Sequence, residues 1–108
     1  MQQNNNDAQP VNMTIAGGTM DRPFSASETQ YAVAVQNAPS ITVTATVTLP
    51  QGATVGAGST SHTGFNNIYN FSATVTPGNL TETITIVIRA QSGVINTITI
   101  TVNMLPPA

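Results

Sequence analysis

The side chains that could do chemistry are few, and the best candidate is a histidine. His62 is the only histidine in the chain, and Ser59 and Ser61 precede it. With an acid such as Asp21 or Glu28 they could form a Ser-His-acid arrangement, which also needs an oxyanion hole. A lone histidine in a segment of glycine, serine and threonine is more typical of a solvated loop. We therefore predict no catalytic residue and no enzyme.

Metal binding has little support in the sequence. Zinc needs three or four ligands, and one histidine with scattered acids does not supply them. Residues 4–7 (NNND) form the only cluster of the oxygen ligands that calcium prefers, and a flexible tail explains them better. The chain has no cysteine, which excludes disulfides and thiolate metal sites. We predict no metal and no cofactor.

A binding surface over residues 60–69 is the second candidate. Phe65 and Tyr69 offer aromatic faces and Asn66 and Asn67 offer amides, a combination that suits a sugar or a protein partner. The alternative interpretation is that the two aromatic rings close the open end of a hydrophobic core. The candidate partner contacts are His62, Phe65, Asn66, Asn67, Tyr69 and Val87.

Alternating side chains predict the strands that must position these segments. Residues 84–88 and 98–104 place aliphatic side chains on one face and mostly hydroxyl side chains on the other, because strand residues switch faces at every step. Residues 91–93 (QSG) join the two runs as a hairpin, and Gly93 suits positive φ there. Similar runs cover residues 11–15, 31–35, 41–49, 53–55 and 69–75.

Composition excludes several kinds of partner. Charged residues make up 6% of the 108 residues, and the net charge is −2 with no lysine; an average globular protein has ~25%. Nucleic acids and anionic membranes attract clustered cations, so neither is expected as a partner. No apolar run approaches the ~20 residues that span a bilayer, so we expect no membrane insertion.

The predicted surface favours assembly. Sheet edges are usually protected by lysine, other charges or proline, whereas the exposed faces here are threonine and asparagine, with Val87 among hydroxyl side chains. A surface with so little charge tends to associate. We infer that neighbouring subunits or partners cover part of it. The alternative is a well-hydrated threonine and asparagine surface, as in many secreted modules.

Several short motifs together resemble one family. They are residues 15–20 (IAGGTM), 23–25 (PFS), 28–31 (ETQY), 41–45 (ITVTA), 52–55 (GATV), 84–90 (ITIVIRA) and 98–102 (ITITV). Over residues 13–103 the chain resembles the bacterial cadherin-like, immunoglobulin-like β-sandwich repeats. The resemblance implies an extracellular or particle-surface spacer or adhesion unit, with no catalytic residues to carry over.

Strand pattern and resemblance together predict the domain organisation. We expect an all-β protein, a seven-stranded antiparallel immunoglobulin-like β-sandwich over residues 11–104. A polar N-terminal arm covers residues 1–10. A C-terminal tail covers residues 105–108, where two prolines lack the N–H that a sheet needs.

Two functions remain open at this stage. The first is a non-enzymatic structural protein that docks on the surface of a virion or similar particle as a decoration or minor coat subunit. The start at Met1, the lack of signal-peptide features and the single small domain favour it, and its partners would be copies of itself or a coat protein. The alternative is an adhesin, spacer or glycan-binding module of a bacterial cell-surface protein, in an extracellular location.

Overall fold

The computed structural model describes residues 6–107, except for the side chain of Phe65. Residues 1–5 of the expected arm and Ala108 of the expected tail lie outside this part. The described residues form nine strands: β1 (Asn12–Ala16), β2 (Thr19–Met20), β3 (Gln30–Val35), β4 (Ile41–Thr48), β5 (Thr54–Val55), β6 (His62–Phe65), β7 (Ile68–Val75), β8 (Thr81–Arg89) and β9 (Ile95–Met104).

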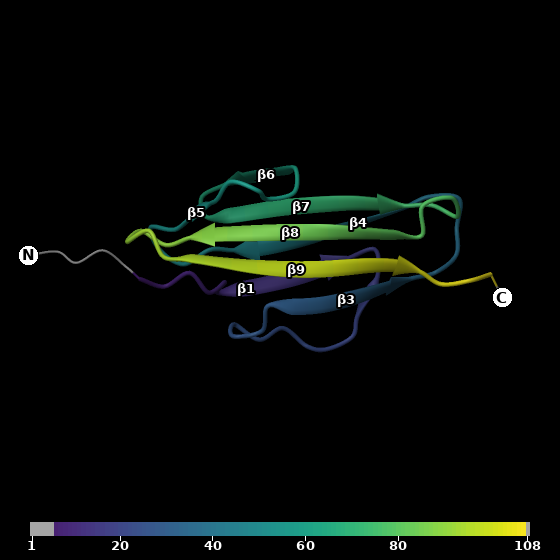
Figure 1. Ribbon diagram of the computed structural model, residues 1–108, viewed down its shortest axis with the longest axis horizontal. Helices are drawn as coiled ribbons and strands as arrows, with labels where there is room; N and C mark the ends of the chain where they lie inside the picture. The colour runs from purple at the N-terminus through teal and green to yellow at the C-terminus, as the bar shows by residue number, and fades with distance from the viewer. Residues whose placement is uncertain (1–5, 108) are drawn as a thin grey trace, which may run out of the picture.

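The strands build two sheets (Figure 1). One sheet has four strands in the order β1-β4-β7-β6, and the other has five in the order β2-β3-β9-β8-β5. Side chains from both sheets form one hydrophobic core, for example Val47 and Phe71 from the first and Ile86 and Ile100 from the second. The domain is therefore an all-β, two-layer sandwich.

Alternation along the strands sets the core, as the sequence predicted. In the β8–β9 hairpin Ile84 lies opposite Ile100, and Ile86 lies opposite Ile98. All four side chains are fully buried, so each pair contributes apolar surface to the interior on the same face of its sheet. At the hairpin tip Gly93 has a φ of 101°, a left-handed value that glycine adopts without strain.

Two strands were not expected, and the predicted count of seven is too low. β2 has only two residues and follows Gly17 and Gly18, and β6 (HTGF) has no alternation of apolar and polar side chains. Each pairs with a longer neighbouring strand: β2 pairs with β3, and β6 pairs with β7. Backbone pairing to an existing strand therefore forms these two elements, and side-chain periodicity does not reveal them.

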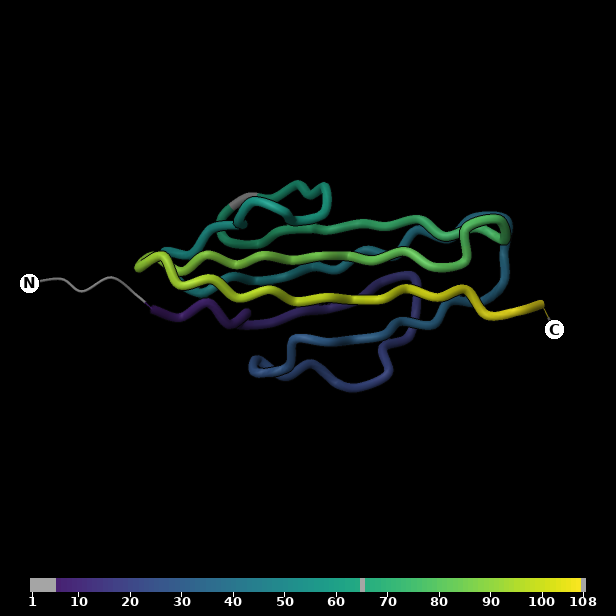
Figure 2. Tube along the Cα trace, viewed as in Figure 1, coloured from purple at the N-terminus to yellow at the C-terminus, as the bar shows by residue number. Residues whose placement is uncertain are grey.

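The sheets are also not wholly antiparallel, because β3 pairs in parallel with β9 from Gln30↔Thr99 to Val35↔Met104. Parallel neighbours need a crossover. The chain between β3 and β9 supplies one, because it alternates between the sheets: it forms β4, β6 and β7 of the four-stranded sheet and β5 and β8 of the five-stranded sheet (Figure 2). Alternation fixes which face of a strand is buried, but it does not fix the direction of the neighbouring strand. The expected antiparallel arrangement therefore holds for every strand pair except this one.

The sandwich is elongated along its strands, the longest of which, β9, has ten residues and spans roughly 33 Å. The described chain enters at the end that carries the tip of the β8–β9 hairpin, and it leaves at the opposite end (Figures 1 and 2). We call these the hairpin pole and the C-terminal pole. At the hairpin pole Ala8 is buried in the core, and its carbonyl accepts a hydrogen bond of 3.3 Å from the Asn96 amide.

Candidate functional site

The β6–β7 hairpin brings five of the predicted contact residues together, and its turn accounts for two of them. Asn66 and Asn67 connect the strands with φ values of 55° and 67°. A two-residue type I′ turn needs positive φ at both central positions, and asparagine tolerates that region better than most residues. The Asn67 carbonyl also accepts a hydrogen bond of 2.8 Å from the Leu49 N–H. Turn geometry therefore explains both asparagines without a ligand.

Tyr69 packs against its own hairpin. It lies opposite Gly64 in the β6–β7 register, and a Cβ built on Gly64 would lie only 2.0 Å from Cδ2 of the Tyr69 ring. An aromatic ring covering a glycine on the neighbouring strand is a known way to stabilise an edge. Tyr69 is half-buried and packs on the core, so one face of this ring is already occupied. The side chain of the neighbouring Phe65 lies outside the described part.

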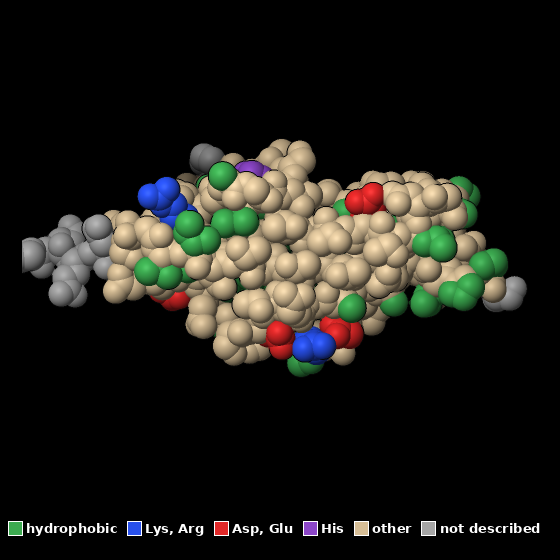
Figure 3. Space-filling model, viewed as in Figure 1, with side chains coloured by type: hydrophobic (Ala, Val, Ile, Leu, Met, Phe, Trp, Pro, Cys, Tyr) green, Lys and Arg blue, Asp and Glu red, His purple; other side chains and the backbone are tan. Residues whose placement is uncertain are grey.

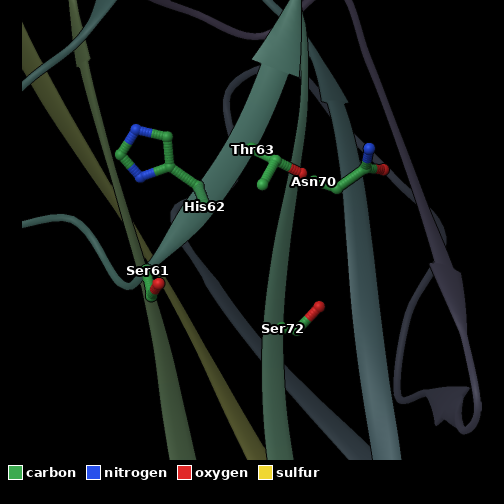
Figure 4. A pocket seen from close by; sticks show the side chains of 5 residues that line it. All are labelled: Ser61, His62, Thr63, Asn70 and Ser72. Carbon is green, nitrogen blue, oxygen red and sulfur yellow. The ribbon is translucent and has the colours of Figure 1, made fainter.

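His62 is held by the backbone and by rings. Its Nδ1 lies 2.9 Å from the Thr60 carbonyl oxygen and donates to it. The imidazole centroid lies 5.1 Å from that of Phe71 and 6.0 Å from that of Tyr69, the latter edge to face. Figure 4 shows His62 on one side of β6 and Thr63 and Asn70 on the other. The histidine therefore completes an aromatic cluster at the sheet edge.

Ser59, Asp21 and Glu28 all bond to partners other than His62. Ser59 donates to the Gly56 carbonyl at 2.9 Å and accepts from the Val87 N–H at 3.0 Å. Asp21 and Glu28 both bind Arg22, at 2.8 and 3.0 Å. Among the described residues no group of three His, Cys, Asp or Glu side chains is placed to hold a metal. Ser59 and the two carboxylates thus bond to backbone groups and Arg22 rather than to His62, whereas Ser61 is exposed directly before His62.

Val87 is covered by its own chain, contrary to its expected exposure among hydroxyl side chains. It is 8% exposed, because the segment 56–60 runs beside it after β5. The Gly56 N–H donates to the Val87 carbonyl at 2.7 Å, and a Cβ on Gly56 would lie 2.7 Å from Val87 Cγ1. The same segment continues past Thr85, where the N–H and carbonyl of Thr85 both bond to Thr60. Val87 is therefore closed to a partner.

Acidic side chains close the opposite edge of the five-stranded sheet. Beyond β2, Asp21 accepts from the Ala32 N–H at 3.0 Å through its carboxylate and donates its own N–H to the Ala32 carbonyl at 2.9 Å. Glu28 accepts from the Gln30 N–H at 3.1 Å. These backbone donors, followed by the Arg22 guanidinium, lower the pKa of both carboxyl groups below their ordinary values.

A ladder of hydroxyl and amide side chains covers the outer face of the four-stranded sheet. Thr42 and Thr74 lie 2.9 Å apart between hydroxyl oxygens, Thr44 and Ser72 lie 3.2 Å apart, and Thr46 donates to Asn70 Oδ1 at 2.7 Å. A shallow hollow of about 240 Å³ beside the ladder is lined by Ser61, His62, Thr63, Asn70 and Ser72 (Figure 4).

This outer face also carries no charge. The strands β1, β4, β7 and β6 read NMTIA, ITVTATVT, IYNFSATV and HTGF, with no Asp, Glu, Lys or Arg. We call the outward-facing side of this sheet the uncharged face; its members include Thr14, Thr42, Thr44, Thr46, Thr63, Asn70, Ser72 and Thr74. The alternating threonines of residues 42–48 are visible in the sequence, but their partners on β7 depend on a register that the sequence does not show.

The chain matches no protein-family model, no curated protein and no solved structure in the three comparisons. No helix in the described part is long and apolar enough to cross a membrane. The features that bear on function are those of the two sheets: one has edges closed by its own chain, and the other has an uncharged outer face.

Proposed function

We propose that this protein is a non-enzymatic, immunoglobulin-like structural module that docks on the surface of a virion or similar particle, as a decoration or minor coat subunit. The observation that carries this proposal is the uncharged face of the four-stranded sheet. Burying a charge against a partner is expensive unless the charge is paired, and the centres of protein interfaces are depleted of charged residues. This face can be buried without that penalty.

The hydroxyl ladder adds a second argument. Its side chains already bond to each other across β4 and β7, for example Thr44 to Ser72 at 3.2 Å. A hydroxyl has one donor and two acceptor lone pairs, so each can also bond to a partner without breaking the ladder. Most of its polar groups would remain paired in the bound state, which keeps the desolvation penalty low.

The closed edges of the other sheet direct the partner to this face. Segment 56–60 and the Asp21 and Glu28 carboxylates occupy backbone groups that would otherwise pair with a foreign strand. Among the side chains that could serve as nucleophile or acid, Ser59, Asp21 and Glu28 are engaged in these closures. The partner in this proposal is a coat protein or another copy, bound through a protein surface.

Cosedimentation tests the proposal. A Ser72→Arg variant places a charge at the centre of the uncharged face, where Ser72 is exposed. Thr83→Arg makes the matched change at an exposed threonine of β8 on the other sheet. We expect wild type and Thr83→Arg to sediment with particles from the source organism, and Ser72→Arg to remain in the supernatant. Absence of wild type from the particle fraction, or equal binding by both variants, contradicts the proposal.

A second function is favoured by one observation. The described chain enters and leaves at opposite poles of the elongated sandwich (Figure 1), an arrangement that suits a spacer or adhesin module of a bacterial cell-surface protein. In that case the location is extracellular and the partner is a neighbouring module or a glycan. Binding of wild type to the cell-envelope fraction, and not to particles, would select this alternative.

A further inference from the structure

The outer face of the five-stranded sheet carries two apolar patches at opposite ends. At the hairpin pole Val94 and Ile95 are 50% and 62% exposed. Toward the C-terminal pole a groove of about 390 Å³ is lined by Thr19, Met20, Asp21, Ala32, Val33, Ala34, Asn103 and Leu105, and Leu105 is 46% exposed. Figure 3 shows hydrophobic side chains gathered near both ends of the molecule, with polar side chains between. We call Val94 and Ile95 the tip patch, and the hollow toward the C-terminal pole the groove.

Strand registers place both patches on the same side of the sheet. Ile98, Ile100 and Val102 of β9 point into the core, so the odd-numbered residues Ile95 and Asn103 point outward. Ala32 and Ala34 flank the buried Val33 in β3 and also point outward, opposite Thr101 and Asn103. Small alanine side chains beside larger neighbours create the hollow of the groove.

The two patches differ in charge. Arg89 lies opposite Ile95 in the β8–β9 register, so its side chain emerges beside the tip patch, and it makes no ion pair within residues 6–107. At the groove, Asp21 and Glu28 share the single cation Arg22, which leaves a formal charge of −1. A cation brought to this cluster would therefore meet a net negative charge.

We propose that two copies of this chain pair through these faces as an antiparallel dimer. The tip patch of each copy fills the groove of the other, and each Arg89 approaches the partner's acidic cluster. Arg89 on β8 and Asp21 beside β3 lie on opposite sides of β9, so the strands of the two copies cross at an angle where one two-fold axis satisfies both contacts twice, as an isologous interface requires. The eight steps from Ile95 to Asn103 at ~3.3 Å each separate the patches by ~26 Å, so the axis passes near Thr99. This pairing uses the sheet opposite to the uncharged face, and it is independent of particle docking.

The area of the outer face of the five-stranded sheet limits the stability of the dimer. The five strands of this sheet have two, six, ten, nine and two residues, which at ~3.3 Å per residue and ~4.8 Å between strands present on the order of 460 Å² per copy, or ~920 Å² for the pair. That total lies below the area of standard stable protein interfaces and in the range of weak, transient ones. The dimer is therefore expected to be weak and concentration-dependent, with monomers at low concentration.

Sedimentation equilibrium over a wide concentration range tests the pairing. We expect a monomer–dimer equilibrium, with a dissociation constant raised about tenfold or more by Ile95→Thr or by Arg89→Glu. Ile68→Thr is the matched control, because Ile68 is a 46% exposed isoleucine at the same pole but on the other sheet. A monomer at ~1 mM, or a dimer that neither variant weakens, overturns the proposal, as does equal weakening by Ile68→Thr.

Cross-linking tests the antiparallel geometry. The chain has no cysteine, so single variants are specific probes. A short bis-maleimide should join Ile95→Cys to Leu105→Cys in a mixture of the two variants, and it should join Ile95→Cys to itself far less. Efficient self-linking of Ile95→Cys would mean a parallel pairing and would overturn the proposal. Assemblies that grow beyond a dimer would overturn the closed two-fold arrangement.

Discussion

The hydroxyl oxygen of Ser59 lies 3.0 Å from the backbone nitrogen of Val87 and accepts its hydrogen bond. Ser59 also donates to the Gly56 carbonyl at 2.9 Å. Ser59, a candidate nucleophile in the sequence, thus accepts the hydrogen bond from β8 that the backbone of a neighbouring strand would otherwise accept. The edge is closed by a side chain where the backbone of β5 has already ended.

Removing this hydroxyl should expose the edge. Ser59→Ala leaves the half-buried Val87 N–H without its partner, and an unsatisfied buried donor costs about 1–3 kcal/mol. We expect a loss of about 1–2 kcal/mol in the free energy of unfolding, measured by urea denaturation, and a greater tendency to aggregate. Ser61→Ala is the control, because Ser61 is exposed. Equal stability of the two variants would show that Ser59 does not support the edge.

Gly64 should not tolerate a side chain. A Cβ there would lie 2.0 Å from the Tyr69 ring, so Gly64→Ala must displace the ring from the hairpin. We expect a destabilisation of about 1–3 kcal/mol, measured by thermal or urea denaturation. Gly78→Ala should change stability little, because the nearest atom to its Cβ lies 4.0 Å away.

A double-mutant cycle tests whether contact with the Tyr69 ring causes the destabilisation by Gly64→Ala. In a Tyr69→Ala background the alanine at position 64 meets no ring, so most of its penalty should disappear as a coupling energy between the two positions. Additive effects of the two substitutions would mean that the ring and the glycine do not constrain each other.

Stability should fall in acid because of the β3 edge. Hydrogen bonds from the Ala32 and Gln30 N–H groups, followed by Arg22, lower the pKa of Asp21 and Glu28 below their ordinary values of 3.8 and 4.5. A carboxyl group with a lowered pKa stabilises the fold fully above its ordinary value, and the contribution is lost as the pH falls through the lowered pKa. We expect the free energy of unfolding to decline below about pH 4.5.

Arg22→Gln provides the check on this pH dependence. Without the guanidinium the two carboxyl groups lose a favourable neighbour, so their pKa values rise toward the ordinary range and the acid decline becomes shallower. The same pH profile for wild type and variant would contradict a role for the Arg22 ion pairs in closing this edge.

Side-chain periodicity predicted the interior well and the edges poorly. Ile84, Ile86 and Ile88 are buried as expected, because a strand that pairs with β9 must place one face on the core. Val87 faces outward with Thr83, Thr85 and Arg89 in the alternation along β8. It is nevertheless covered, because residues 56–60 fold over it. Val11 was grouped with the first strand and is 62% exposed, since β1 begins at Asn12.

Side-chain pattern also predicted the location of the candidate contact residues better than their structural roles. The sequence indicated amides and aromatic rings in residues 60–69, and the structure does bring them together in one hairpin. It could not indicate that Asn66 and Asn67 meet the φ requirements of a turn, or that Tyr69 lies against Gly64. Those facts depend on a strand, β6, that has no periodic pattern.

Thiol accessibility on the assembled particle tests the docking role of the uncharged face most directly. The chain has no cysteine, so Ser72→Cys and Thr83→Cys each provide one thiol, on opposite sheets. On the particle, maleimide labelling of Ser72→Cys should slow by about tenfold or more relative to the free protein, because an occluded thiol reacts only during dissociation. Thr83→Cys should label at an unchanged rate. Unchanged labelling of Ser72→Cys on the particle would contradict docking through this face.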